Sequence, residues 1–588
     1  MANKSLFSSQ RTPVVPVADM LNAAGGKAYA YNPKHALAQI AATNCFNGTF
    51  YASAQDNLKI AQDAARALDG DPKFIAQTAV FARDRAYMKD MPAFLTVRLA
   101  SLNTTLFRQV FRRVIDNGKM LRNFVQMARG VDGSGNCAAT ATGKVLNMTS
   151  YAIKAAIQEW FNSRDAYTIF KASIGNDPSM RDILRMCRPK PNTPEKAALF
   201  AYLKGAEYDK EARVYRTLRY KNHKDASDGT YVLYEHSYDD LPLIVRQYEE
   251  YKLAKDGPVP KVDFRMLDSL GIGPAEWKEI AKSAPWQMTR MNLNTFKRHG
   301  VFEDPAMVEM IAERLRDSEQ VNRSRVFPYQ LLMAYLATNG NMPTQISLAL
   351  QDAMEIAVSN VPEISGQMYV CVDTSGSMGS AVTGYRTGST SAARCVDVAA
   401  LFACTMLRVN KLAKVIPFDT STHKHDLNPR DSIVTNAAKL ARYGGGGTDC
   451  SCPVAELNRN NAKGDLIVFV SDNESWVDNG RNSAYYGTGY GRGTGLMNEW
   501  LGFKKRNPQA KLVCIDLTPS PSSQVKQHPD ILQVGGFSDQ VFDVIRTFRE
   551  GGSDADHWVK VIESVDLGAK SSAPVVEEVA EVELESSE

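Results

Sequence analysis

The sequence lacks the features of membrane proteins and of disulfide-rich secreted proteins. Its 588 residues contain no apolar run of about 18 residues, so no membrane-spanning helix is expected. The first residues, MANKSLFSSQRTPVV, have no apolar signal core, which predicts a cytoplasmic protein. The nine cysteines are odd in number, and no CxxC pair has a second half. We therefore expect no zinc site, and we interpret the only close pair, Cys450 and Cys452, as reduced structural thiols.

The sequence also lacks the common signatures of enzymes. It has no GxSxG elbow, no GxxxxGK[ST] phosphate-binding loop and no HExxH zinc helix. His423 and His425, in THKHD, could ligate a metal, but we interpret them as residues of an exposed loop. We expect a binding protein and not an enzyme, and we keep a metal-dependent hydrolase as a third hypothesis.

Charge is nearly balanced overall but unevenly distributed. The net charge is +4, and residues 571–588, SSAPVVEEVAEVELESSE, hold six Glu and no Lys or Arg. Without them the chain has 69 basic and 59 acidic residues, a net charge of +10. This composition is typical of a disordered acidic tail, which we place at 563–588. A positive body favours an anionic partner.

The pattern of apolar residues divides the rest of the chain into three parts. Residues 1–25 are expected to form an irregular N-terminal arm. Over 26–362, segments such as DPKFIAQTAVFARDRAY carry apolar residues three and four apart, and strand-like alternation is nearly absent. Many short helices in succession predict an α-helical repeat of stacked, HEAT-like pairs. Over 363–562, strand and helix patterns alternate, which predicts an α/β doubly wound, Rossmann-like domain.

The stretch MYVCVDTSGSM, Met368 to Met378, contains the strongest candidate site. A buried strand leads into Asp373, Ser375 and Ser377, which suit a hard, oxygen-preferring cation such as Mg²⁺. This short loop cannot supply all six ligands. Two later segments can add oxygens: GGGGTD, with Thr448, and DLIVFVSD, an apolar strand that ends at Asp472. Ligands of doubly wound sheets bind at the carboxyl ends of the strands, where both aspartates fall.

These three segments resemble the metal-ion-dependent adhesion site of von Willebrand factor A domains. The resemblance implies that Asp373, Ser375, Ser377, Thr448 and Asp472 hold one divalent cation, with Mg²⁺ the expected ion. In that family the open coordination position takes a carboxylate from a partner protein, which is binding and not catalysis.

The helical part followed by this domain resembles the Ro (TROVE-domain) family of RNA-binding proteins. SDNESW and GGGGTDC resemble that family's metal loops, while MRDILRMCRPKP and SRVFPYQLLMAYL resemble two of its helical segments. The resemblance implies a helical ring closed by the A domain. It also implies binding of single-stranded 3′ ends of misfolded RNA in the ring and of small Y-type non-coding RNA on its outside. Arg188 stands where the family often has His, and Lys171 alone represents a more basic family segment.

The residues themselves also indicate where RNA could bind, because phosphates need cations and unstacked bases need flat partners. KEARVYRTLRYKNHK spaces three arginines every three residues, which predicts one helical stripe with interleaved tyrosines. A charge run can equally be a plain solvated face. The candidate RNA-binding residues are Arg112, Arg113, Lys171, Arg185, Arg188, Lys190, Arg213, Arg216 and Arg219.

Two further segments stay open between structural and functional interpretations. PWQMTRMNLNTFKRHGVF, residues 285–302, is either a pair of helix ends capped by Asn or a loop lining the ring. The Gly- and Tyr-rich segment 478–494 is either an insertion or a partner-binding lip beside the cation.

We therefore predict an RNA-binding protein of ribonucleoproteins or RNA quality control, with a nuclease or another protein as a candidate partner at the cation. A closed ring needs no second subunit, so a monomer is expected. The alternative is a cation-dependent protein–protein binding module without a role in RNA.

Overall fold

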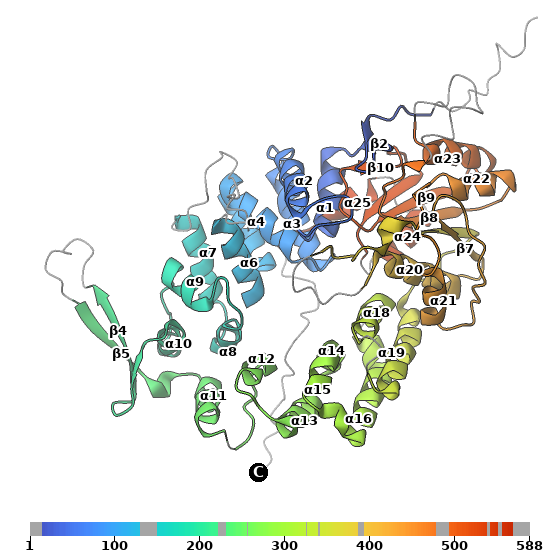
Figure 1. Ribbon diagram of the computed structural model, residues 1–588. Coiled ribbons are helices and arrows are strands. Elements are labelled where there is room, and N and C mark those ends of the chain that lie inside the picture. Colours follow the sequence, from blue (N-terminus) through green and yellow to red (C-terminus); the bar gives the residue numbers. More distant parts are fainter. Residues whose placement is uncertain are drawn as a thin grey trace, which may run out of the picture.

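The computed structural model describes most of the chain. The described residues are 15–129, 150–220, 231–255, 257–324, 326–338, 342–385, 393–477, 493–537, 541–550 and 556–568. The first part is an array of helices that curves away from the second part and returns to it (Figure 1). Its helices are α1 (Pro33–Thr43), α2 (Ala54–Arg66), α3 (Pro72–Asp84), α4 (Asp90–Leu102), α5 (Thr104–Val114), α6 (Gly118–Arg129), α7 (Tyr151–Asn162), α8 (Ala166–Lys171), α9 (Met180–Cys187), α10 (Pro194–Lys204), α11 (Leu243–Ala254), α12 (Phe264–Asp268), α13 (Pro274–Ser283), α14 (Trp286–Met291), α15 (Leu293–Arg298), α16 (Pro305–Arg316), α17 (Ser318–Arg323), α18 (Pro328–Ala337) and α19 (Thr344–Ala357).

Polar caps and apolar faces explain why these segments are short helices. The Ser53 and Ser179 side chains each accept a backbone hydrogen bond at the start of α2 and α9, and Asp56 and Asp182 complete capping boxes there. Neighbouring helices then bury their apolar stripes against one another, as α3 does against α4 and α5. That these packed helices are HEAT-type repeats stays a prediction.

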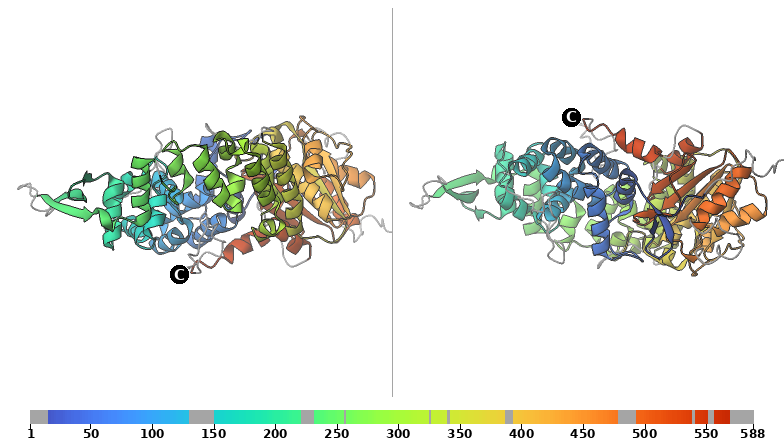
Figure 2. Two further views of the ribbon diagram at one scale, coloured as in Figure 1. Left: turned by 90° about the horizontal axis from the view of Figure 1, so that it is seen from below. Right: turned by 90° about the horizontal axis from the view of Figure 1, so that it is seen from above.

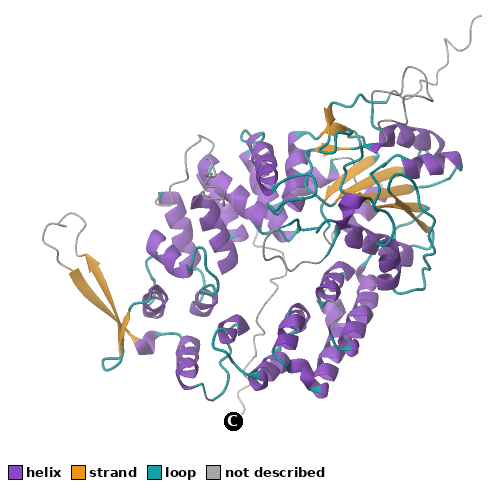
Figure 3. Cartoon of the chain, viewed as in Figure 1, coloured by secondary structure: helices purple, strands orange, loops and turns teal. Residues whose placement is uncertain are grey.

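The helical prediction is wrong for residues 207–209, 214–220 and 231–237, which form a three-stranded antiparallel sheet. Its strands are β3 (Glu207–Asp209), β4 (Val214–Tyr220) and β5 (Tyr231–Ser237). The segment VYRTLRY is rich in aromatic and β-branched residues, and it pairs residue for residue with YVLYEHS. The sheet projects from the side of the array that is farthest from the second part (Figures 2 and 3).

The second part is an α/β domain built on one parallel sheet, which we call the A domain. The strand order is β11-β9-β8-β6-β7. Its elements are β6 (Met368–Asp373), α20 (Cys395–Val409), β7 (Ala413–Phe418), α21 (Ile433–Leu440), α22 (Cys452–Arg459), β8 (Leu466–Ser471), α23 (Gly495–Arg506), β9 (Lys511–Asp516), β10 (Ser522–Ser523), β11 (Ile531–Gly535), α24 (Val541–Arg549) and α25 (His557–Glu563). The predicted fold class, a helical array followed by a doubly wound domain, is confirmed.

The two faces of this sheet belong to different hydrophobic cores, because side chains alternate along each strand. Tyr369 and Cys371 of β6 pack in a core with Trp500 and Phe503 of α23. Val370 and Val372 pack in a core that includes α20 and α24 and continues into the helical array. The A domain and the array therefore share one continuous core.

Both ends of the helical array contact the A domain, which closes a ring (Figure 1). At one end α1 packs on β11, and α25 packs on α1 and α3; at the other end α18 contacts α20 and α19 contacts α21. The N-terminal segment also joins the A domain, because β2 (Lys27–Ala30) pairs with β1 (Met20–Leu21) and with β10. The boundaries 1–25, 26–362, 363–562 and 563–588 stay predictions.

Candidate cation site and basic surface

The five residues predicted to hold a cation surround the carboxyl ends of β6 and β8. Asp373 is the last residue of β6, and Asp472 follows β8 directly. These strands are neighbours at the point where the strand order reverses, since β7 lies beyond β6 and β9 lies beyond β8. Connections leave such a switch point in opposite directions and open a crevice there.

The glycine loop at 444–447 brings Thr448 to the same place. Gly445 N–H donates to the Thr374 carbonyl at 3.1 Å, and Gly376 N–H donates to the Gly446 carbonyl at 3.0 Å. Gly444 has φ +93°, and a Cβ there would lie 1.7 Å from the Thr374 oxygen. The two loops touch through their backbones, and only glycine permits this approach.

Three of the five residues are joined by hydrogen bonds. The Ser375 and Ser377 hydroxyl oxygens are 3.2 Å apart, and Ser375 N–H donates to Asp373 Oδ1 at 2.9 Å. All five residues are at most 4% exposed, so their oxygens lie in the protein and not on its surface.

Two buried oxygens of this group lack a hydrogen-bond partner among the described residues: Thr448 Oγ1 and Asp472 Oδ1. A buried polar atom without a partner costs about 1–3 kcal/mol, and a bound ion is one way to offset that cost. Two carboxylates and three hydroxyls are the oxygen ligands that Mg²⁺ prefers. The residues present therefore fit the cation that the resemblance implies.

The electrostatics of the two aspartates fit a cation as well. Burial raises the pKa of Asp373, and repulsion from Asp472 raises it further. Burial likewise raises the pKa of Asp472, and Glu474 adds to this effect. A divalent cation between them would neutralise both charges and remove the repulsion.

Most of the predicted RNA-binding cations are already paired with acids. Arg112 lies 2.6 Å from Glu159, and Arg113 lies 2.7 Å from Asp84 in a pair whose side chains are 10% and 6% exposed. Lys171 lies 3.7 Å from Asp263. A paired cation adds little net charge to a surface, so these three residues are weak candidates for phosphate contacts.

The arginines of the hairpin do not form the predicted helical stripe. Arg213 precedes β4 with φ +53°, while residues 216 and 219 lie within this strand and not in a helix. Arg213 pairs with Asp239 at 2.8 Å, and Arg216 pairs with Asp209 at 2.8 Å. The side chain of Arg219 lies outside the described part of the chain.

The remaining predicted cations lie in a basic surface around α9, which we call the α9 patch. Arg185, Arg188 and Lys190 are exposed, and within the described ranges none of them forms an ion pair. Arg188 ends α9 in the left-handed conformation. Helices α6 and α7 pack on α9 and add cations. The α9 patch consists of Arg129, Lys154, Arg181, Arg185, Arg188 and Lys190.

The comparisons with known proteins agree with both parts of the structure. Residues 258–347 match the family described as the TROVE domain, and residues 367–484 match the family described as the Ro60 vWA domain. These two segments of the chain are thus similar to the two domains of Ro proteins. The second match includes all five residues of the cation site, whereas the first does not reach the α9 patch.

Two Ro relatives and one solved structure show how far the likeness extends. RNA-binding protein RO60 of Deinococcus radiodurans is 24% identical over 562 residues, which are 90% of this chain and 95% of that protein. RNA-binding protein RO60 of Caenorhabditis elegans is 27% identical over 184 residues, 30% of this chain and 28% of that protein. The crystal structure of the Deinococcus radiodurans RO (RSR) protein covers 88% of this chain and 100% of its own, with a TM-score of 0.55 at 19% identity.

Sequence reasoning missed several residues that surround the candidate cation site. Ser471 Oγ donates to Asp373 Oδ2 at 2.6 Å. Asp516 closes β9 on the same edge of the sheet, and its Oδ2 accepts from Tyr31 at 2.8 Å and from Gln39 at 3.0 Å. Burial raises the pKa of Asp516 to about 8. KLVCID, an apolar strand that ends at Asp516, was a sequence signal for this aspartate. No sequence signal indicated its partners Tyr31 and Gln39.

The two loop histidines and the segment 285–302 take structural roles. His423 Nε2 lies 3.0 Å from Asp419, whose other oxygen accepts from Gly446 N–H, and His425 Nε2 lies 2.8 Å from the Val415 carbonyl. Residues 286–298 form α14 and α15, with Trp286 buried and donating to the Leu315 carbonyl. Residues 478–492 lie outside the described residues.

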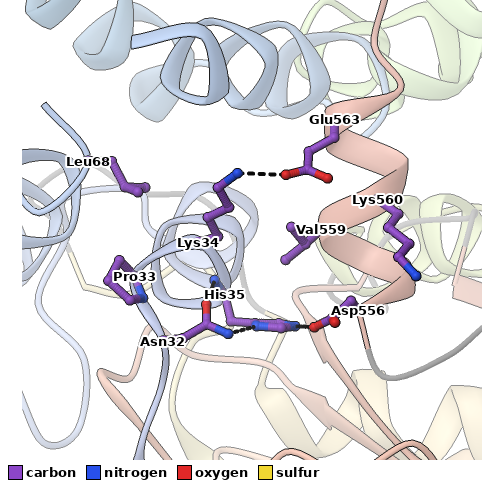
Figure 4. Close-up of a pocket in the computed structure, with 9 residues that line it drawn as sticks. All are labelled: Asn32, Pro33, Lys34, His35, Leu68, Asp556, Val559, Lys560 and Glu563. Carbon is purple, nitrogen blue, oxygen red and sulfur yellow. Dashed lines mark hydrogen bonds and ion pairs between the residues drawn. The ribbon is translucent and has the colours of Figure 1, made fainter. Parts of the chain in front are cut away.

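A cavity of about 460 Å³ lies between α1 and α25, away from the cation site (Figure 4). Lys34 pairs there with Glu563 at 2.6 Å, and His35 lies 3.6 Å from Asp556. The mixed charges of this lining select no ligand class, so we interpret it as part of the joint between α1 and α25.

Across the described residues, no helix is long and apolar enough to cross a bilayer.

Proposed function

We propose that this protein binds RNA through its helical array and holds a divalent cation, Mg²⁺, in its A domain. The proposed RNAs are small Y-type non-coding RNA and the single-stranded 3′ ends of misfolded RNA. The proposed role is in a ribonucleoprotein or in RNA quality control in the cytoplasm. The protein would act as a monomer, because both ends of its array contact the A domain of the same chain.

The unpaired cations of the α9 patch are the observation that supports RNA binding most directly. Its six cations lie on adjoining helices, and Asp182, which caps α9, is the acid that lies near Arg129 and Arg185. Unpaired cations neutralise phosphates and release counterions, which drives sequence-independent binding of nucleic acid. The relatives named RNA-binding proteins support the same class of ligand.

The cation would serve binding and not catalysis. Asp373, Ser375, Ser377, Thr448 and Asp472 would hold it, and the ion would supply an open position for a carboxylate. We propose that a protein, such as a nuclease that works on the bound RNA, presents that carboxylate. The residues of this chain would orient the cation and exclude water from its buried side.

A gel-shift titration with two RNAs would test RNA binding. One RNA is a structured hairpin, and the other is the same hairpin with a single-stranded 3′ tail, each measured at two salt concentrations. We expect tighter binding of the tailed RNA and a steep loss of affinity with salt. Equal, weak and salt-independent binding of both RNAs would contradict the proposal.

A charge-reversal variant would connect that binding to the α9 patch. Arg185→Glu/Arg188→Glu/Lys190→Glu changes three exposed cations on the array. The matched control is Lys411→Glu/Arg430→Glu/Lys505→Glu, which changes three exposed cations of the A domain by the same net charge. We expect the first variant alone to lose RNA affinity. Equal losses in both variants would show that only total charge matters.

The second candidate function is a cation-dependent protein-binding module without a role in RNA. The buried oxygen site, with its two unpartnered atoms, favours it. The change Asp373→Ala separates the two functions, because it would abolish all binding under this candidate and would spare RNA binding under the first. Capture of partner proteins with and without Mg²⁺ would then identify the ligand.

A further inference from the structure

The acidic end of the chain, residues 569–588, follows directly on a stretch that is fixed to the helical array. Residues 569–588 lie outside the described residues, and Gly568 is the last residue before them. Helix α25, which ends at Glu563, packs on α1 and α3. Two residues before Gly568, the Asp566 carbonyl accepts from Arg113 Nη1 of α5 at 2.6 Å. The acidic end therefore starts at the surface of α5.

Contacts between neighbouring helices lead from α5 to the α9 patch. Arg112 of α5 pairs with Glu159 of α7 at 2.6 Å. One residue earlier on α7, Gln158 Nε2 donates at 2.7 Å to the carbonyl of Lys190, a member of the patch. Helices α7 and α9 also contact each other and lie side by side (Figure 1). Two steps between adjacent helices thus connect the start of the acidic end with the patch.

The acidic end is long enough to cover these two steps. Packed helices lie about 8–10 Å apart, so two steps amount to about 20 Å. The first glutamate, Glu577, stands nine residues after Gly568. An extended chain spans about 3.3 Å per residue, so these nine residues reach up to about 30 Å. The glutamates can therefore lie on the α9 patch of the same chain.

The charges of the two partners are opposite and equal in number. Residues 577–588 hold six Glu and no Lys or Arg. The α9 patch has six cations, and among the described residues none of them forms an ion pair. A phosphate backbone and a row of carboxylates both present negative charges along a chain, so both can bind the same Arg and Lys side chains.

We propose that the acidic end, residues 569–588, binds the α9 patch of its own chain and competes with RNA for it. This inference rests on the proposed RNA-binding function and adds a regulation of that same site. A segment tethered to its site acts at an effective concentration of about millimolar, so a weak contact is enough to compete. RNA that offers the patch few phosphates would be excluded, and RNA that neutralises it more fully would displace the acidic end.

Replacing the six glutamates by glutamine in the full-length protein removes the charge and keeps the length. This six-Gln variant carries Glu577→Gln, Glu578→Gln, Glu581→Gln, Glu583→Gln, Glu585→Gln and Glu588→Gln. In gel shifts at low salt, we expect it to bind the hairpin RNA with the 3′ tail about three- to tenfold more tightly than wild type does. The gain should shrink as salt screens the contact. Equal affinities at low salt would overturn the inference.

Charge reversal at the patch separates a contact from a general repulsion between carboxylates and RNA. If the acidic end occupies the patch, adding the six Gln changes to Arg185→Glu/Arg188→Glu/Lys190→Glu should alter RNA affinity by less than about twofold. Added to the A-domain triple variant that is the control above, the same changes should give the full gain. Equal gains in both backgrounds would show repulsion alone and would overturn the inference.

A labelled peptide with the sequence of residues 569–588 tests the contact without RNA. Its fluorescence anisotropy should rise on addition of the full-length six-Gln variant. This rise should be lost when the three patch cations are reversed and kept when the three A-domain cations are reversed. If RNA binds but the peptide does not, the inference fails and the RNA-binding function stands. If the peptide binds but RNA does not, the RNA-binding function fails, and with it the proposed competition.

Discussion

The cation site and the surface of the helical array use charge in opposite ways. In the A domain, Asp373 and Asp472 are buried side by side, and Asp472 keeps an oxygen without a partner among the described residues. On the array, exposed arginines such as Arg112 and Arg216 are neutralised by acids, and the α9 patch is left unpaired. We therefore base the proposed functions of both regions on charges that the described residues leave uncompensated.

This comparison explains why five residues suggest a cation site, whereas the many cations of the array do not by themselves suggest an RNA-binding site. Burying two carboxylates side by side costs free energy, and a bound cation would offset that cost. Exposed cations cost little and occur on most surfaces. Their number therefore says less about function than their lack of partners does.

The largest expected effect follows removal of one buried charge. Asp373→Asn keeps the shape of the side chain, and we expect Mn²⁺ or Mg²⁺ affinity to fall at least about a hundredfold, measured by calorimetry. RNA affinity should stay within about twofold. In EDTA the thermal midpoint should equal or exceed that of wild type, because the repulsion with Asp472 is gone. Loss of RNA binding in this variant would join the two regions into one site.

The next effect concerns the backbone contact that assembles the cation site. Gly444→Ala would place a methyl group against the Thr374 backbone, and we expect about 3 kcal/mol of destabilisation together with loss of cation binding. Gly445→Ala is the control, because Gly445 has φ +108° with nothing within 4 Å of its Cβ, and only about 1–2 kcal/mol of conformational strain applies. Thermal midpoints that rank the two variants in the opposite order would contradict this geometry.

A pH effect distinguishes buried acids from surface cations. The folded-state pKa of Asp516 is about 8, above its ordinary 3.8, so the stability tied to its protonated form is complete below about pH 4 and is lost as the pH rises towards 8. Asp516→Asn should remove this loss. In EDTA, its free energy of unfolding relative to that of wild type should therefore rise by about 3 kcal/mol between pH 5 and pH 8. Urea unfolding at several pH values measures it, and parallel curves for the two proteins would refute it.

The smallest effects should come from arginines that already have partners. The α9 triple variant should lose about ten- to thirtyfold in RNA affinity and lower the slope of log affinity against log salt by about 2. Arg213→Glu/Arg216→Glu should lose less than about threefold, because both arginines are paired. Gel shifts at several salt concentrations compare the two; a larger loss in the hairpin variant would reverse our ranking of the basic residues.

Much of the cation site was predictable because its requirements are local. Asp373, Ser375 and Ser377 follow a buried strand at fixed spacing, and Thr448 and Asp472 stand in segments with their own glycine and apolar signatures. The alternation of strand and helix then dictates that both aspartates meet at one edge of a parallel sheet. Ser471, whose hydroxyl donates to Asp373, was not predictable, since it does not belong to the spacing of the candidate ligands.

The same reasoning was less successful for the helical array. Its helices were predictable from apolar spacing, yet VYRTLRY was assigned to a helix because its arginines recur every three residues. Pairing with the strand YVLYEHS decided the matter. Pairing with Glu235, Asp239 or Glu159 depends on chain folding, and no spacing of arginines reveals it.

The sequence by itself predicted most helices of the array, the alternation of strand and helix in the A domain and the five candidate oxygen ligands, because these depend on periodicity and on residues close in the chain. Only the tertiary structure decided which of the described cations stay unpaired and how the A domain closes the ring. Ring closure depends on contacts between residues hundreds of positions apart, and the pairing of an arginine such as Arg112 with Glu159 depends on how neighbouring helices pack, so both are settled only when the chain folds.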